Sequence, residues 1–214
     1  ILMHPMEAKK EHIGTGRLAN LALENSQIIV DENFDDNKKV KKLLSSKEYF
    51  PILLYPGENS INIDKEDVPI SFYKDKTPIV FVIDGTWHCA KSMMRDSTCL
   101  HNLPRISFSP LKKSNFKIKQ QPADYCLSTI ESIYQVVSSL EKQGLENLKD
   151  KKEILPKLLK QLVEFQVKCA NDPNLTNYHH GRKKKGFSKP SERKISKKWE
   201  SRKICFEEKN YNKK

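Results

Sequence analysis

Residues 78–95 limit the fold of this chain more than any other stretch. Five consecutive apolar residues, Ile79 to Ile83, stand between Pro78 and the turn dipeptide Asp84-Gly85. A run of this length, rich in β-branched residues and closed by turn residues at both ends, is typical of a strand buried on both faces. The stretch therefore predicts a central strand of a parallel sheet.

A helical pattern follows this strand directly. Thr86 is the predicted N-cap, and four residues then recur at helical spacing: Trp87, Ala90, Lys91 and Met94. Asp84 is thus expected at the carboxyl end of the strand, where ligands bind in open α/β sheets. We interpret Asp84 as a chemical group of a site. The alternative is that it only caps the helix or closes the turn.

Strand and helix patterns alternate along the rest of the chain. This alternation predicts an α/β domain with a mostly parallel sheet flanked by helices. Neither Gly-x-Gly-x-x-Gly nor Gly-x-x-x-x-Gly-Lys is present, so neither a Rossmann fingerprint nor a P-loop is supported. Residues 59–76 are expected to form a loop or a short surface helix. Further strands are expected at 1–3, 27–30, 51–55 and 103–108, and further helices at 15–22, 38–46, 128–140 and 153–170.

Most of the net charge of +12 lies in the C-terminal tail. Residues 182–214 hold 14 Lys/Arg against 4 Asp/Glu, so the preceding part of the chain is nearly neutral. We therefore expect a domain at residues 1–178 and a basic tail at 179–214. Such a tail is typical of a partner that is a polyanion, with nucleic acid as the first candidate and an acidic membrane as the second. The alternative is a tail that only aids solubility.

A second basic segment lies within the domain, around Phe116. Cations interleaved with an aromatic residue suit backbone contact and base stacking in RNA. The alternative is a solvated edge strand. The lysines of this segment that we assign to RNA contact are Lys112, Lys113 and Lys117.

Cysteine usage and hydropathy indicate a cytoplasmic protein. The five cysteines are dispersed without a Cys-x-x-Cys pair, which is typical of reduced thiols and not of a disulfide framework or a zinc site. No apolar run approaches the ~20 residues of a membrane span, and no cleavable signal peptide is visible, although the sequence begins at Ile1 without a methionine. We expect no metal and no membrane. The oligomeric state is left open, with a monomer favoured.

Six motifs in order resemble the DTW-domain family, and the resemblance covers roughly residues 1–165. Asp84-Gly85-Thr86-Trp87 is similar to the Asp-x-Thr-Trp signature of that family. The other motifs are His4-Pro5-x-Glu7, Thr15-x-Arg17-Leu18-Ala19, Leu53-Leu54-Tyr55-Pro56-Gly57, Leu103-Pro104-Arg105 and Leu127-Ser128-Thr129-x-Glu131.

The resemblance implies a tRNA-uridine aminocarboxypropyltransferase. Such enzymes move the 3-amino-3-carboxypropyl group of S-adenosylmethionine to N3 of a tRNA uridine, giving acp3U and 5′-methylthioadenosine. It also implies a SPOUT-like fold with a knot in the C-terminal part of the sheet, an exception to ordinary chain topology. Many members carry a cysteine-rich segment before the His-Pro strand, and this chain starts at that strand. The alternatives are a SPOUT-type RNA methyltransferase using the same pocket and a non-catalytic RNA-binding protein.

The resemblance also implies a set of site residues. Asp84 is the expected general base for the uridine N3 proton. S-adenosylmethionine is expected to contact Leu54, Tyr55, Pro56, Gly57, Thr86, Leu103, Pro104, Arg105, Tyr125, Leu127, Ser128, Thr129 and Glu131. The tRNA is expected to contact Arg17, Lys91, Arg95, Lys112, Lys113, Lys117, Arg182, Lys183, Lys184 and Lys185.

Overall fold

A computed structural model describes residues 1–10, 14–57, 59–69, 72, 74–110, 112–118 and 126–171, and the fold is given for these. The chain divides into a first unit, Ile1–Glu164, and a second, Phe165–Lys214. The description below concerns the first unit, because only the last turns of one helix are described in the second. The expected boundary near residue 178 and the basic tail lie outside the described residues and stay predictions.

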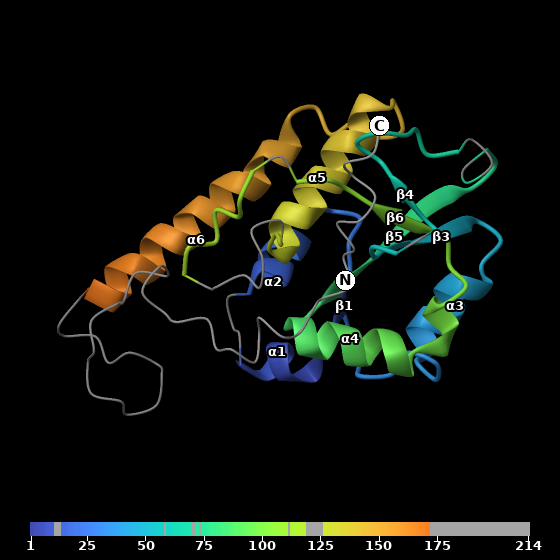
Figure 1. Cartoon of the computed structure of the whole chain (residues 1–214), viewed down its shortest axis with the longest axis horizontal. Helices are drawn as coiled ribbons and strands as arrows, with labels where there is room; N and C mark the ends of the chain where they lie inside the picture. The colour runs from blue at the N-terminus through green and yellow to red at the C-terminus, as the bar shows by residue number, and fades with distance from the viewer. Residues whose placement is uncertain are drawn as a thin grey trace, which may run out of the picture. The chain divides into compact units, whose positions relative to one another are not determined.

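Six parallel strands form the centre of the first unit (Figure 1). Their order across the sheet is β2-β1-β5-β3-β6-β4, and each described pairing of neighbours is parallel. The predicted α/β fold with a mostly parallel sheet is therefore confirmed. The strands span Leu2–Met3 (β1), Ile29–Val30 (β2), Tyr49–Leu54 (β3), Ser60–Asn62 (β4), Thr77–Asp84 (β5) and Arg105–Ser107 (β6).

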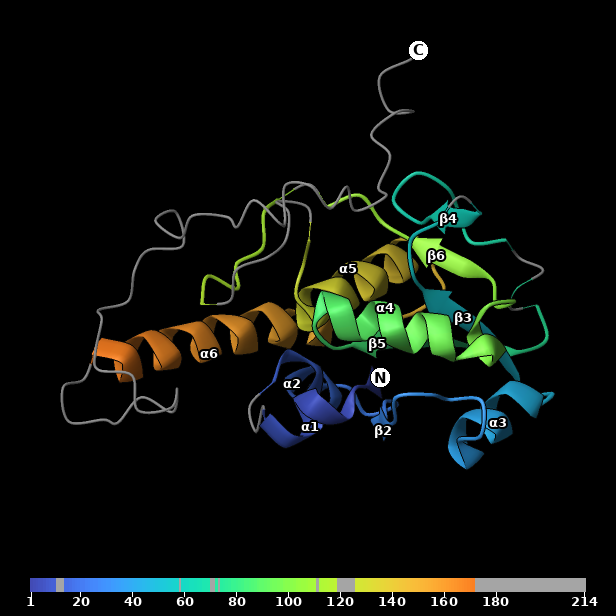
Figure 2. The same ribbon diagram turned by 60° about the horizontal axis from the view of Figure 1, so that its bottom comes forward.

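Helices cover both faces of this sheet, and their order can be followed in Figure 2. Predicted helices at 15–22, 38–46, 128–140 and 153–170 are all present within one or two residues of the expected bounds, whereas the helix after His4 was not foreseen. No helix of the described part is long and apolar enough to cross a membrane. The helices span Pro5–Lys10 (α1), Thr15–Ala22 (α2), Lys38–Ser45 (α3), Trp87–Asp96 (α4), Thr129–Lys142 (α5) and Ile154–Asn171 (α6), with short 3₁₀ turns at Thr98–Leu100 (η2) and Lys151–Glu153 (η3).

Alternation along β5 explains why the strand is apolar throughout. Phe81 packs in one cluster with residues of α3 and α4, while Val82 packs in another with residues of α2, α5 and the start of α6. Successive side chains of a strand point to opposite faces, so a strand with helices on both sides must be apolar at every position. The prediction of a central buried strand is confirmed.

The edge strand β4 was not expected. Residues 59–76 were expected to be a loop or a surface helix, but Ser60–Asn62 pair with β6, and Ile63 continues the ladder with an N–H bond to the Ser107 carbonyl at 2.9 Å. The propensity of three residues is weak, so the partner strand decides the conformation here. β6 consequently lies between β3 and β4, although these two strands follow one another in the sequence with residues 55–59 between them. The predicted knot is not tested by this arrangement and stays a prediction.

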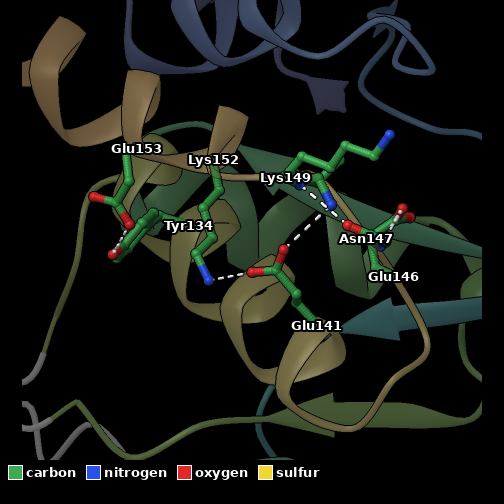
Figure 3. A network of polar contacts seen from close by, with 8 residues as sticks. Tyr134, Glu141, Glu146, Asn147, Lys149, Lys152 and Glu153 are labelled. Carbon is green, nitrogen blue, oxygen red and sulfur yellow. Dashed lines mark hydrogen bonds and ion pairs between the residues drawn. The ribbon is translucent and has the colours of Figure 1, made fainter.

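A polar network fixes the connection from α5 to α6 (Figure 3). Glu141 pairs with Lys152, and the side chains of this pair are 22% and 20% exposed. Glu141 also accepts the Leu148 N–H at 3.2 Å, and the Tyr134 hydroxyl donates to Glu153 at 2.9 Å. These bonds hold the start of α6 against α5, where Leu155 and Leu159 of α6 are buried.

Asp35 joins the loop after β2 to the turn after α4. Its two carboxylate oxygens accept the Cys99 N–H and the Thr98 hydroxyl, each at 2.8 Å. The bond from the Cys99 N–H is the largest cause that lowers the pKa of Asp35, from 3.8 to about 2. Burial, followed by the neighbouring Asp35 carboxylate, raises the pKa of the Cys99 thiol to about 12, so this thiol is protonated at neutral pH.

Asp35→Asn should lower stability at neutral pH, because an amide oxygen replaces a carboxylate that accepts two bonds. A lowered pKa means that the folded state favours the charged form, so this stabilisation is present above pH 3.8 and is lost as the pH falls towards about 2. The difference between the wild type and Asp35→Asn in urea denaturation should therefore be constant from pH 5 to 7 and shrink below about pH 4. The exposed Asp75 supplies the control Asp75→Asn. A difference that does not change with pH would contradict the interpretation.

Candidate active site

The carboxyl ends of β1 and β5 meet at one edge of the sheet. Met3 is in register with Asp84, and the His4 N–H donates to the Asp84 carbonyl at 2.9 Å. His4 then begins α1, with Pro5 at the first helical position and the His4 Nδ1 accepting the Met6 N–H at 3.1 Å. The buried His4 is thus accounted for by the start of α1. The predicted Asp84 turn lies beside it, at the edge where α/β proteins bind ligands.

The turn from β5 into α4 depends on a glycine and a cap. A Cβ on Gly85 would lie 3.2 Å from the Cβ of Cys89 and 3.4 Å from the Cβ of His4. Thr86 is exposed and accepts the Cys89 N–H at 3.2 Å, so the predicted N-cap is confirmed. The absence of a side chain on Gly85 lets β5, β1 and α4 approach closely at this point.

The Asp84 carboxylate is almost fully buried between two helix N-termini. Its residue is 9% exposed, and its Oδ1 accepts the hydroxyl of Thr129, the first residue of α5, at 2.5 Å. A Cβ on Gly16 in the first turn of α2 would lie only 2.3 Å from the Asp84 Oδ2. Helix N-termini favour negative charge. Asp84 therefore links β5, α2 and α5 through one charged group.

The N-terminus of α5 is itself held by a predicted capping box, which is present. Glu131 Oε2 accepts the N–H of the buried Ser128 at 2.9 Å and the Ser114 hydroxyl at 2.6 Å. Its Oε1 accepts the Asn115 N–H at 2.7 Å. Both oxygens thus bind the protein itself. The expected contacts of Ser128 and Glu131 with S-adenosylmethionine are not tested by these bonds and stay predictions.

Tyr55, Gly57 and Arg105 come together where β3 ends and β6 begins. The Arg105 guanidinium carbon lies 5.9 Å from the centre of the Tyr55 ring, and its Nη2 donates to the His101 carbonyl at 3.3 Å. A Cβ on Gly57 would lie 3.2 Å from the Arg105 Nη1. Burial raises the pKa of Tyr55, and the Arg105 cation opposes this shift to a smaller extent. Two of the predicted cofactor loops are therefore neighbours at this edge.

The other expected cofactor residues lie near the end of β3, before the start of β6 and before the start of α5. Leu54 is in register with Val82 of β5 and with Ile106 of β6, and the Pro104 carbonyl accepts the Leu53 N–H at 2.9 Å. Leu103 is half-buried against the cluster of α3 and α4. Pro56 and Leu127 are half-buried as well, and Tyr125 lies outside the described residues.

The expected RNA contacts fall into three groups. Exposed lysines free to approach a polyanion include Lys91 on α4 and Lys112 and Lys117 in the loop after β6. Two arginines make contacts within the protein: the Arg17 Nη2 donates to the Ala8 carbonyl at 3.0 Å, and the Arg95 Nε lies 2.7 Å from Asp96. Lys113 is exposed, and residues 182–185 lie outside the described part.

Residues 1–167 match the family model described as "DTW domain". The chain belongs to the DTW-domain family. It is 28% identical to tRNA-uridine aminocarboxypropyltransferase 2 of Drosophila melanogaster over 172 residues, which are 78% of this chain and 63% of that protein. It is 24% identical to the protein of the same name from Macaca fascicularis, over 84% of this chain and 58% of the relative.

The mouse protein of the same name, from Mus musculus, is 24% identical over 78% of this chain and 54% of the relative. This DTW-family chain thus spans somewhat more than half the length of the curated relatives it matches. No solved structure matches it. The recognition of the family from its motifs is confirmed.

Gly16 was not among the residues predicted for the site. The signal that could have identified it is the position of β1 beside β5 in the sheet. β1 lies beside β5, so the segment that follows β1 must pass the end of β5, and a glycine there leaves room for a side chain. The hydroxyl of Thr129 is hydrogen-bonded to Asp84, and the expected contact of Thr129 with S-adenosylmethionine stays a prediction.

Gly16→Ala should destabilise the protein, although alanine favours a helix over glycine by about 1 kcal/mol. The new methyl group would overlap the Asp84 carboxylate, which is held by its bond to Thr129 and would have to give up that position. Urea denaturation followed by circular dichroism measures the change. In an Asp84→Ala background the same substitution should cost little, since the carboxylate is gone. Leu21→Ala, at an 83% exposed position of the same helix, is the control. A more stable Gly16→Ala variant would contradict the geometry.

Proposed function

We propose that this protein is a tRNA-uridine aminocarboxypropyltransferase. It transfers the 3-amino-3-carboxypropyl group of S-adenosylmethionine to N3 of a uridine in tRNA, which gives acp3U and 5′-methylthioadenosine. The match of residues 1–167 to the DTW domain carries the proposal, together with relatives that are named for this activity over most of the chain. The position of Asp84 at the ligand-binding edge of a parallel sheet supports it.

The residues at this edge fit the chemistry of S-adenosylmethionine. Its carboxylate requires a cation or free N–H groups, and both are close to the strand ends: the Arg105 guanidinium and the first turn of α4 behind the exposed Thr86. Its adenine requires an apolar surface with backbone groups, for which we propose Tyr55 and Leu103, because both pack against the cluster on the α3 and α4 face. Leu54 packs on the other face of the sheet. When bound, S-adenosylmethionine supplies the electrophilic carbon next to its sulfonium.

Asp84 is the proposed base. Uridine N3–H is a weak acid, so its nitrogen attacks well only when a base removes the proton. In the proposed step the N3 proton passes to the Asp84 carboxylate, the N3–C bond forms, and the C–S bond breaks with its electron pair on sulfur. Asp84 is the carboxylate of the Asp-x-Thr-Trp turn and faces the N-termini of α2 and α5, whose positive ends favour its ionised form.

The proposed substrate is tRNA, and the proposed fold is the SPOUT-like one with its knot. Lys91, Lys112 and Lys117 are exposed and available for phosphate contact, and the basic residues 182–185 add charge. We place the enzyme in the cytoplasm on the basis of its dispersed cysteines.

Incubation of unmodified tRNA with the protein and S-adenosylmethionine should yield a uridine heavier by an aminocarboxypropyl group, together with methylthioadenosine. Mass spectrometry of the nucleosides measures both. Asp84→Asn should lower the rate at least about 100-fold, because the amide keeps the shape of the side chain but accepts no proton. Binding of tRNA should stay close to that of the wild type.

Asp75→Asn, at an exposed position, is the matched control for this loss. A methylated nucleoside with adenosylhomocysteine would assign the protein to the methyltransferases instead. Bound tRNA without any product would favour an RNA-binding protein. Equal loss of transfer and of tRNA binding in Asp84→Asn would argue against a base.

Replacing the four basic residues 182–185 by alanine should weaken tRNA binding and flatten its dependence on salt. Each lost phosphate contact lowers the slope of log K against log salt by somewhat less than one, so the four together should lower it by about 3. Filter binding over a series of salt concentrations measures this slope. The control variant replaces four exposed lysines elsewhere, Lys142, Lys149, Lys157 and Lys160. Equal slopes for the two variants would mean that residues 182–185 make no specific contribution.

A further inference from the structure

We propose that Thr129 is a positioning residue that sets the orientation of the Asp84 carboxylate through its hydroxyl group. This inference rests on the proposed function, in which Asp84 receives the uridine proton. It gives Thr129 a different role from the expected contact with S-adenosylmethionine. The observation behind it is the 2.5 Å distance between the Thr129 Oγ1 and the Asp84 Oδ1.

A bond of this length is typical of a hydroxyl that donates to an ionised carboxylate. Threonine has one hydroxyl proton, so a proton donated to Asp84 is not available to another acceptor. The Thr129 hydroxyl thus contacts the proposed base directly. The Asp84 residue is 9% exposed, and a charge-assisted bond is stronger there than in water.

The backbone of Thr129 has little freedom to move. The residue before it, Ser128, is buried and bonded to Glu131, and the residue after it, Ile130, is 1% exposed in the cluster of α2, α5 and α6. Glu131 in turn binds Ser114 and Asn115. The hydroxyl is therefore presented from a fixed point, as a positioning residue requires.

The first turn of α2 limits the carboxylate on its other side. A Cβ placed on Gly16 would lie only 2.3 Å from the Asp84 Oδ2. The Thr129 hydroxyl thus holds one oxygen of the carboxylate, and the first turn of α2 leaves little room beside the other. A base held in this way has a restricted orientation, and small misplacements of catalytic groups are costly.

The hydroxyl also has a predictable effect on the pH dependence of the reaction. A bond donated to a carboxylate favours its charged form, so its removal should raise the pKa of Asp84. The Ile1 ammonium, just before β1, interacts electrostatically with the Asp84 carboxylate. The ionisable side chains next to the residues that touch Asp84 are His4 at the end of β1, Arg17 on α2 and Glu131 on α5. All of them remain in a Thr129 variant. The acidic limb of kcat/KM should therefore move to higher pH when the hydroxyl alone is removed.

The test compares three variants of the full chain in the nucleoside assay. Thr129→Val keeps the shape but lacks the hydroxyl, and should lower kcat about tenfold at pH 7, with the acidic limb moved up by about one pH unit and KM for tRNA little changed. Thr129→Ser keeps the hydroxyl and should have the kcat and the acidic limb of the wild type. Thr98→Val is the matched control, because it removes an equivalent hydroxyl bond to Asp35, at 2.8 Å, outside the site.

The inference is overturned if Thr129→Val has the kcat and the pH profile of Thr98→Val while the wild type and Asp84→Asn behave as proposed above. It is also overturned if activity falls only in proportion to the folded fraction measured by circular dichroism. A wild type that forms no product would remove the proposed function and this inference together. If Thr129→Val does not fold, Thr129→Ala against Thr129→Ser gives the same comparison.

Discussion

One buried carboxylate joins the three segments that form the ligand-binding edge. Asp84 ends the central strand β5, binds the first residue of α5 and occupies the space over Gly16 in α2. A carboxylate in a residue that is 9% exposed needs such partners, because an ionised group buried without them would cost several kcal/mol. The proposed chemical group is therefore also a structural one, bonded to α5, while the cap of α4 is Thr86, and the chemical role of Asp84 stays a prediction.

Two regions of the edge differ in how they are held. Around Asp84, the Thr129 hydroxyl of α5 and the close approach of Gly16 in α2 hold one carboxylate, and the Ile1 ammonium interacts with it electrostatically. In the second region, the Arg105 guanidinium lies near the Tyr55 ring and donates to the His101 carbonyl. Its other N–H groups are available as donors to a ligand. The proposed reaction would use both regions. A positive group would bind the carboxylate of the donor molecule, and a proton acceptor at the other end would face the acidic N–H of the nucleotide.

The predictable features of the fold are those whose conformation is determined within one short segment of the sequence. β5 was predictable because burial on both faces demands an apolar residue at every position, and the Thr86 and Ser128 caps follow from local hydrogen bonding. β4 and the contact between Gly16 and Asp84 were not, because each depends on a partner far away in the sequence. The roles of individual residues at the site were predicted from the resemblance to the DTW-domain family, and the structure adds the bond between Thr129 and Asp84, which no sequence pattern indicates.

The insertion of β6 between β3 and β4 has a consequence for the order of folding. β4 follows β3 closely in the chain, yet it cannot pair with the sheet until residues 105–107 of β6 lie between β3 and β4. Contacts between distant segments form late, because loop closure costs entropy before any pairing compensates for it. During synthesis from the N-terminus, β1, β2, β3 and β5 can assemble first, and β4 remains without a partner until β6 is made. The Tyr55 and Arg105 side of the proposed site therefore waits for β6, and the Asp84 side waits longer still for Thr129 of α5, so a partly folded chain would have the carboxylate at its strand end before its hydroxyl partner is in place.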